Sequence, residues 1–475
     1  MSSNTMSSDA MSTDTAPRAK KLYEQYRNPD KTRIDPDILK RVNRSFTWWG
    51  RLLVLLASVL YIMAIWHFTA RSSAWYLLGG IMFVYMLVKK ACALLYRPSK
   101  AELTKDYKVS VILTCYNEDP QAVVSILDNI LELDYPVHEI IFLDDGSADP
   151  TACQVAQSYA DDHKDRPGAP IYQILCFEKN RGKRAVMTDG FKAATGDYVF
   201  MLDSDIEILP NALTELLRPF EDGKTTSVVG NISVLNRQNF LTKMQAMTYF
   251  NAFQQGRSAQ SIFGDVIVCS GAFTLHQKAF IMAHLQEFKE SKALGVTVSS
   301  GDDRQLTSFS RMSGGKTRYQ NTAYGETMVP ATWRKFQAQR RRWQRSAYIC
   351  SLTTIRDLFP RKPLFMLWSF AEAYFWLIAL ILTIVTAIAT GGFYFDWRDF
   401  LIFTSIALLM HNGFYLLYRP LHFFLVPLYT LVYGISLAFT RVHAFVTLGN
   451  DGWGTRNVEE DEAEKEDAEN HSEIL

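Results

Sequence analysis

Three acidic clusters in the middle of the 475-residue chain have the residue types and spacing of a nucleotide and metal site. Two carboxylates separated by one residue can share a hard divalent cation with diphosphate oxygens, and Mg²⁺ and Mn²⁺ prefer such ligands. Each cluster alone is weak evidence, because Asp-Gly is common in turns and Asp-x-Asp is common by chance. The clusters are Tyr116-Asn117-Glu118, Asp144-Asp145-Gly146-Ser147 and Asp203-Ser204-Asp205.

A basic loop lies between two of these clusters. It reads Asn180-Arg181-Gly182-Lys183-Arg184 and precedes a predicted helix. Free N–H groups and the helix dipole add to the side-chain charge at such a position, which suits a diphosphate. A solvated basic turn is the alternative, and only the position of the loop between two acidic clusters favours the diphosphate.

Two further motifs lie toward the end of the same region. Gly301-Asp302-Asp303-Arg304 supplies a second pair of carboxylates, and Gln339-Arg340-Arg341-Arg342-Trp343 places a tryptophan on a strongly basic helix. Residues 333–348 also have the basic and aromatic mixture of a helix at a membrane interface, which is the alternative explanation for the arginines. That alternative does not exclude a catalytic role for Trp343.

The elements that must position these motifs alternate between strands and helices. Apolar runs that are hydrophobic on both faces indicate buried strands of a mainly parallel sheet, covered by helices on both sides. Ligands of such sheets bind beyond the carboxyl ends of the strands, where the polar clusters fall. The predicted strands are 109–115, 139–144, 172–175 and 197–203, and the predicted helices lie near 120–133, 150–162 and 184–194.

Uncharged stretches flank this region on both sides. The first two, 52–70 and 72–88, are long enough for a hairpin of membrane-spanning helices, and similar stretches recur at 373–395, 400–418 and 420–440. Lys and Arg cluster in the loops that would face the cytoplasm. The fold class predicted is therefore an α/β domain in the cytosol, inserted between transmembrane helices, with four firm spans and a fifth segment left open.

Composition excludes some classes of protein. The 50 Lys and Arg residues nearly balance the 49 Asp and Glu residues, which argues against a nucleic-acid partner. Six cysteines lie far apart and have no zinc-type spacing, so neither a disulfide framework nor a structural metal cluster is expected. The acidic segment 459–475 is predicted to be a solvated tail. The oligomeric state is left open, a monomer included.

Taken together, the motifs in this order resemble the processive family-two glycosyltransferases, which include the synthases of hyaluronan, chitin and cellulose. The stretches 236–273 and 299–307, with the late Trp453-Gly454-Thr455-Arg456, look most like hyaluronan synthases. The resemblance implies a glycosyltransferase A-type, Rossmann-like domain in a multi-pass protein of the plasma membrane. It divides the chain into 1–46, a basic N-terminal segment; 47–97, a transmembrane hairpin; 101–332, the cytosolic domain; 333–360, interface helices; 363–447, C-terminal membrane helices; and 448–475, the tail.

The resemblance also implies a role for each motif. The uridine would be held by Tyr116, Glu118 and Asp145, with Asp144 beside it. The diphosphate would be held by Lys183 and Arg184. Asp203 would bind the donor, and Asp205, with Asp203, would bind Mg²⁺ or Mn²⁺. Asp303 would be the general base and Asp302 its partner, although these two roles could be exchanged. Trp343 would form a floor for the acceptor sugar, Gln339 and Arg342 would fix its helix near the diphosphate, and Cys269, Ser270 and Gly271 would line the acceptor site.

The implied reaction uses UDP-GlcNAc and UDP-glucuronate, inverts the anomeric carbon and exports the nascent polysaccharide through the lipid bilayer. Arg304 is a candidate for the glucuronate carboxylate, and Glu372, His411 and Asn412 are candidates for the export path. A chitin or chito-oligosaccharide synthase, which needs only UDP-GlcNAc, is the nearest alternative, and a transferase acting on a lipid phosphate is a more distant one. An inactive polysaccharide-export scaffold is the alternative of another class.

Overall fold

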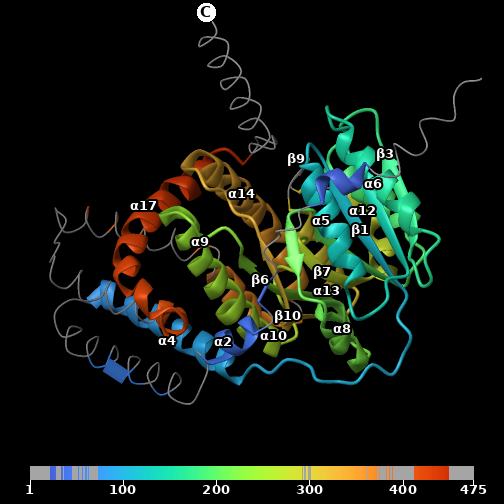
Figure 1. Cartoon of the computed structure of the whole chain (residues 1–475). Coiled ribbons are helices and arrows are strands. Elements are labelled where there is room, and N and C mark those ends of the chain that lie inside the picture. Colours follow the sequence, from blue (N-terminus) through green and yellow to red (C-terminus); the bar gives the residue numbers. More distant parts are fainter. Residues whose placement is uncertain are drawn as a thin grey trace, which may run out of the picture.

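The computed structural model describes residues 22–27, 34–35, 37–44, 73–290, 292–293, 296–297, 301–359, 361–371 and 411–448, with a few single positions between them. A sheet with α-helices on both faces fills one side of the molecule, and α4 (Ser73–Leu95), α9 (Phe240–Phe250), α14 (Trp333–Leu358) and α17 (Leu425–Val446) gather on the other side (Figure 1). The predicted α/β class is confirmed for the domain that carries the motifs.

The central sheet has eight strands in the order β3-β2-β1-β4-β7-β6-β10-β5. The first four run parallel, β7 is antiparallel to both β4 and β6, β10 is parallel to β6, and β5 is antiparallel to β10. The strands are β1 (Val109–Cys115), β2 (Glu139–Asp144), β3 (Ile171–Cys176), β4 (Tyr198–Asp203), β5 (Ile206–Ile208), β6 (Thr225–Val234), β7 (Phe273–Gln277) and β10 (Lys316–Thr327).

Every strand and helix predicted between residues 101 and 204 is present. β1, β2 and β4 are buried at most of their positions, whereas β3, at the edge of the sheet, is only partly buried. Along β1, Val111 and Leu113 pack toward α5 (Pro120–Leu131) and α6 (Thr151–His163), while Ile112 between them packs toward α7 (Lys183–Ala193). This alternation with a period of two residues is what a strand covered on both sides requires. The register pairs Cys115 with Asp144 and Thr114 with Asp203, so three polar clusters leave the sheet at one edge.

Helices and short strands that were not predicted complete the second half of the domain. They include α8 (Ala212–Leu217), a π-helical turn η3 (Asn251–Arg257), α10 (Ser258–Ile262), α11 (Lys278–Ala283), α12 (Leu285–Glu290) and α13 (Asp302–Met312). The first turn of α13 carries the second acidic pair, and α13 packs against α14, which carries the basic motif with the tryptophan. This packing brings two motifs almost 40 residues apart in the chain, 302–303 and 339–343, into one region.

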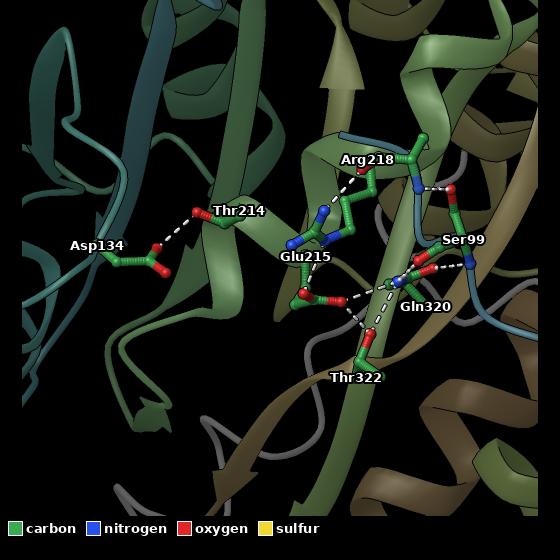
Figure 2. Close-up of polar contacts among 8 residues, drawn as sticks. Ser99, Asp134, Thr214, Glu215, Arg218, Gln320 and Thr322 are labelled. Atoms are coloured by element: carbon green, nitrogen blue, oxygen red, sulfur yellow. Dashed lines mark hydrogen bonds and ion pairs between the residues drawn. The ribbon is translucent and has the colours of Figure 1, made fainter. Parts of the chain in front are cut away.

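The segment that leaves α4 is fastened to the far edge of the sheet by a polar network. The Gln320 amide donates to the Ser99 carbonyl at 2.9 Å and accepts from the Ser99 N–H at 3.0 Å. It also donates to Glu215, which accepts from Arg218 at 2.8 Å, as Figure 2 shows. The segment that follows α4 is therefore held against β10 by directional contacts, and β10 is held to α8 in the same way.

Two cysteines that are distant in the sequence lie side by side in the fold. Cys153 at the start of α6 and Cys176 at the end of β3 have 6.3 Å between their Cα atoms. Spacing in the sequence did not predict this pair, because the two residues meet only when α6 packs beside β3. Among the described residues, the remaining four cysteines are free.

Much of the predicted membrane region lies outside the described residues. This applies to most of 47–72, to most of 372–410, which includes Glu372, and to the tail with Trp453 to Arg456. Within the described part of the chain, no helix combines the length and the apolar composition needed to cross a membrane. The predicted spans and the domain boundaries stay predictions.

Candidate active site

Two adjoining cavities lie at the carboxyl edge of the parallel strands. The smaller, of about 200 Å³, is lined by Tyr116, Glu118, Asp145, Lys183, Asp203, Asp205 and Arg342, among others. The larger, of about 940 Å³, is lined by Lys183, Asp203, Asp205, Ser270, Gly271, Asp302, Asp303, Arg304, Gln339, Arg342 and Trp343, with further residues from α4, η3 and α14. Lys183, Asp203, Asp205 and Arg342 line both, so the two cavities adjoin at these four side chains.

The turn after β2 is held in one conformation. Asp144 is buried and accepts from the Ser147 N–H at 3.2 Å and from its hydroxyl, while that hydroxyl accepts from the Asn117 N–H at 2.8 Å. Asp144 therefore faces its own turn and does not line the smaller cavity, whereas Asp145 does. The sequence could not separate these two neighbours, because the difference depends on which way each side chain points.

Gly146 connects this turn to the basic loop. Its φ is +71°, and a Cβ atom there would lie 2.4 Å from the carbonyl carbon of Lys179. The Arg181 N–H donates to Asp145 at 2.7 Å across the same contact. Glycine is thus required at this position both by backbone conformation and by the close approach of the loop.

Lys183 begins α7 and its ammonium donates to the Asp203 carboxylate at 2.8 Å. Burial alone would lower the pKa of Lys183, but the Asp203 carboxylate outweighs it and the pKa is raised, so the cation persists at neutral pH. Burial in the cleft, with the carboxylates of Asp203 and Glu118 nearby, raises the pKa of Asp205 to about 7. Negative charge is therefore crowded at the end of β4.

Arg184 lies elsewhere than expected. It forms an ion pair with Asp302 at 2.7 Å, donates to the Phe288 carbonyl at 2.9 Å and stacks on the Phe288 ring. It lines neither cavity, so the structure shows it holding Asp302 rather than facing a diphosphate position. Asp302 is buried, and burial raises its pKa although Arg184 and Lys183 oppose the shift.

Asp303 and the tryptophan motif meet because α13 and α14 approach closely. Gly301, which caps α13 with a φ of +94°, leaves so little space that a Cβ there would lie 2.1 Å from the Ser346 hydroxyl. The loop at 269–272 packs on the other side, where a Cβ on Gly271 would lie 3.8 Å from that of Asp303. Trp343 faces the larger cavity with 37% of its surface exposed.

Cys269 differs from the expectation for the acceptor site. Its side chain is fully buried, burial raises the pKa of its thiol to about 12, and Ser270 and Gly271 line the cavity instead. The Cys269 N–H donates to the Thr307 hydroxyl at 2.9 Å, which fixes the loop to α13. Cys269 therefore packs behind the cavity wall formed by Ser270 and Gly271.

Sequence reasoning missed several residues of the larger cavity. Lys90 of α4 and Asn251, Gln255 and Arg257 of η3 line it, although none was given a role. The only available signal was a polar run, NAFQQGR, inside a stretch singled out for resemblance alone. Among the described residues, no group of three or more His, Cys, Asp or Glu side chains is placed to hold a metal ion.

Comparisons with known proteins agree with this geometry. The family "Glycosyl transferase family 2" matches residues 110–284, and "Glycosyl transferase family group 2" matches residues 198–449. A mannosyltransferase from Pyrobaculum calidifontis, solved with GDP-Man and Mn²⁺, superimposes with a TM-score of 0.52 at 20% identity, over 82% of this chain and 99% of that one. The fold is thus that of a glycosyltransferase A-type enzyme.

Proteins similar in sequence indicate which group of glycosyltransferases this chain belongs to. The hyaluronan synthase of Streptococcus pyogenes is 31% identical over 408 residues, 85% of this chain and 95% of that protein. An N-acetylglucosaminyltransferase of Mesorhizobium japonicum is 29% identical over 242 residues, 50% of this chain and 56% of that protein. The chain belongs to the family-two glycosyltransferases, to the group that contains the hyaluronan synthases, and is a UDP-sugar-dependent transferase.

The close approach at Gly146 generates a prediction. Gly146→Ala should weaken UDP binding by about tenfold, or ~1.4 kcal/mol, because the added methyl group must displace the loop that leads to Lys183. Gly168→Ala is the matched control, since Gly168 also has a positive φ, +76°, but nothing lies within 4 Å of its Cβ position. Calorimetric titration with UDP measures both variants. Equal UDP affinities for the two would contradict a role for this contact.

Proposed function

We propose that this protein is a processive, inverting membrane glycosyltransferase that polymerises UDP-GlcNAc and UDP-glucuronate into hyaluronan and exports the chain. The observation that carries the proposal is that Asp205 and Asp303 line one cavity, which Lys183 and Trp343 also line. The 31% identity to a hyaluronan synthase over most of both chains supports this product. We assign Tyr116, Glu118 and Asp145 to the uridine, since they line the smaller cavity.

The residues at the end of β4 fit a divalent cation. Asp205 has a raised pKa because burial and two further carboxylates disfavour its charge, and a cation there would relieve that repulsion. Asp205, with Asp203, would hold Mg²⁺ or Mn²⁺ together with diphosphate oxygens, which is how these ions are usually bound. When bound, the ion neutralises the charge that develops on the leaving diphosphate. The P. calidifontis enzyme, which has the same fold, was solved with Mn²⁺.

The residues of the chain supply the other parts of the reaction. Lys183 adds a fixed positive charge beside the diphosphate, and Arg342 lines both cavities and can do the same. Trp343 provides a flat apolar surface for the acceptor ring. Asp303, across the cavity, accepts the proton of the acceptor hydroxyl as that oxygen attacks the anomeric carbon. A single displacement of this kind inverts the configuration and converts an α-linked donor into a β-linkage.

Export and membrane location belong to the same proposal. The larger cavity extends from Asp303 to Met366, Ser369 and His411, which lie next to the uncharged stretches of the C-terminal region. A hydrophilic chain that grows at Asp303 could leave along these residues into a path through the bilayer. The uncharged stretches at both ends of the domain would place the enzyme in the plasma membrane, with its active site in the cytosol.

A synthase that uses only UDP-GlcNAc is the second candidate, favoured by the relatives that are N-acetylglucosaminyltransferases. Purified protein supplied with each labelled donor separates the two. We expect polymer only when both UDP-GlcNAc and UDP-glucuronate are present, and we expect a hyaluronan lyase to digest it completely. Polymer formed from UDP-GlcNAc alone would instead identify a chitin-type synthase.

The assignment of Asp303 as the base predicts that its substitution impairs sugar transfer but not UDP binding. Asp303→Asn should reduce polymer synthesis by about 10²-fold or more, the usual contribution of a general base. UDP binding should be retained, because Asp303 does not line the smaller cavity. Asp161→Asn, an exposed change on α6, is the control and should have wild-type activity. An Asp303→Asn enzyme that polymerises at the wild-type rate would remove this assignment.

The assignment of Asp205 as a metal ligand predicts that sugar transfer depends on a divalent cation and on this carboxylate. Chelation with EDTA should stop synthesis, and added Mg²⁺ or Mn²⁺ should restore it. Asp205→Asn should raise the metal concentration needed for half-maximal rate by about tenfold, the loss expected when one charged ligand becomes neutral. Metal titrations of sugar transfer by both proteins make the measurement. Full activity of the wild-type enzyme in EDTA would exclude the metal from the reaction.

A further inference from the structure

Two cations line the larger cavity but not the smaller one, and the proposed reaction gives neither of them a role. Lys90 lines the larger cavity from α4 and Arg257 lines it from η3. Within the described parts of the chain, neither side chain forms an ion pair with a carboxylate, in contrast to Lys183, which pairs with Asp203. Both cations face a space that the transfer reaction at Asp205 and Asp303 does not account for.

Lys90 is deeply buried. Only 4% of its surface is exposed, its ammonium lies 3.4 Å from the side-chain amide oxygen of Gln255, and it lies 5.0 Å above the Phe414 ring. A buried ammonium is costly unless an anion compensates it, and a long contact to a neutral amide compensates only in part. The cavity beside it is where such an anion can be accommodated.

Arg257 is the last residue of the π-helical turn η3. Its guanidinium stacks on the Phe253 ring at 3.7 Å and donates to the Val268 carbonyl at 3.2 Å. It is close enough to Asp303 to interact with that carboxylate electrostatically, so it lies on the catalytic side of the cavity. A stacked guanidinium keeps donors in one plane available for a carboxylate.

A buried polar network connects η3 to the helix at 411–418. The Asn251 amide donates to Asn412 at 2.6 Å, and Gln255 donates to Asn251 at 2.7 Å and to the His411 carbonyl at 2.9 Å. All of these contacts originate in η3, and π-helical turns occur frequently at functional sites. The turn thus ties the catalytic domain to the helix at 411–418 and, through the contact between Lys90 and Gln255, to α4, while its own Arg257 lines the cavity.

We infer that Lys90 and Arg257 form a binding site for the carboxylates of an acidic polysaccharide as it leaves the catalytic centre. The inference rests on the proposed function, because it supposes that uronate-containing chain passes from Asp303 toward His411. A chain that carries a carboxylate on every second sugar can engage one cation near the acceptor and the other farther along. A neutral chain would leave both cations uncompensated, so the site favours an acidic product over chitin.

The test measures binding of end-labelled oligosaccharides to the purified full-length protein. The acidic probe is a hyaluronan oligosaccharide, and the neutral probe is a chito-oligosaccharide of the same length. We expect Lys90→Gln and Arg257→Gln each to weaken binding of the acidic probe by at least about fivefold, with less than about twofold change for the neutral probe. Lys90→Arg, which keeps the charge, should retain most of the preference for the acidic probe.

Lys164→Gln is the matched control, because Lys164 is an exposed cation on α6, remote in the fold from both cavities, and its loss changes the net charge equally. UDP binding by every variant verifies that the protein is folded. Unchanged binding of the acidic probe, or equal losses for both probes, would overturn the inference and indicate a merely structural role. Polymer synthesis by the wild-type enzyme from both donors is recorded in parallel, so failure of the proposed function is distinguished from failure of this site.

Discussion

The site depends on how the negative charges of four carboxylates in one cavity are compensated. These carboxylates are Asp203, Asp205, Asp302 and Asp303. Two of them are compensated by cations from adjacent positions of one helix: Lys183 pairs with Asp203 and Arg184 pairs with Asp302. Among the described residues, Asp205 and Asp303 form no ion pair, and these are the two carboxylates that we propose for the metal ion and for the proton. Adjacent residues of α7 thus compensate two of the four acids and leave the other two without an ion pair in the described part of the chain.

Packing makes this separation possible. The parallel strands deliver Asp145 and Asp203 to one edge because their register aligns the strand ends. Asp303 comes from a helix about a hundred residues after β4, and it reaches the same cavity because Gly301 lets α13 lie directly against α14. The part of the site that we assign to the nucleotide is therefore positioned by the sheet, and the part that we assign to the acceptor is positioned by contacts between helices.

These two origins explain how much could be predicted from the sequence. The strands at 109–115, 139–144 and 198–203 were predictable, because burial on both faces leaves an unbroken apolar run that ends in a polar cluster. The pairing of Arg184 with Asp302, the inward direction of Asp144 and the burial of Cys269 were not predictable. Each depends on the direction of a side chain or on a partner distant in sequence. The basic wall formed by Lys90 and Arg257 was missed for the same reason.

The central claim is that one cavity holds the nucleotide sugar on one side and an ionised carboxylate on the other. A structure of the full-length protein with Mn²⁺, UDP and an N-acetylglucosamine acceptor tests this most directly. The account predicts the ion beside Asp205, the acceptor ring over Trp343, and an acceptor hydroxyl within hydrogen-bond distance of Asp303. An acceptor bound with its hydroxyls directed away from Asp303, or a diphosphate bound outside the Lys183 and Asp205 edge, would contradict it.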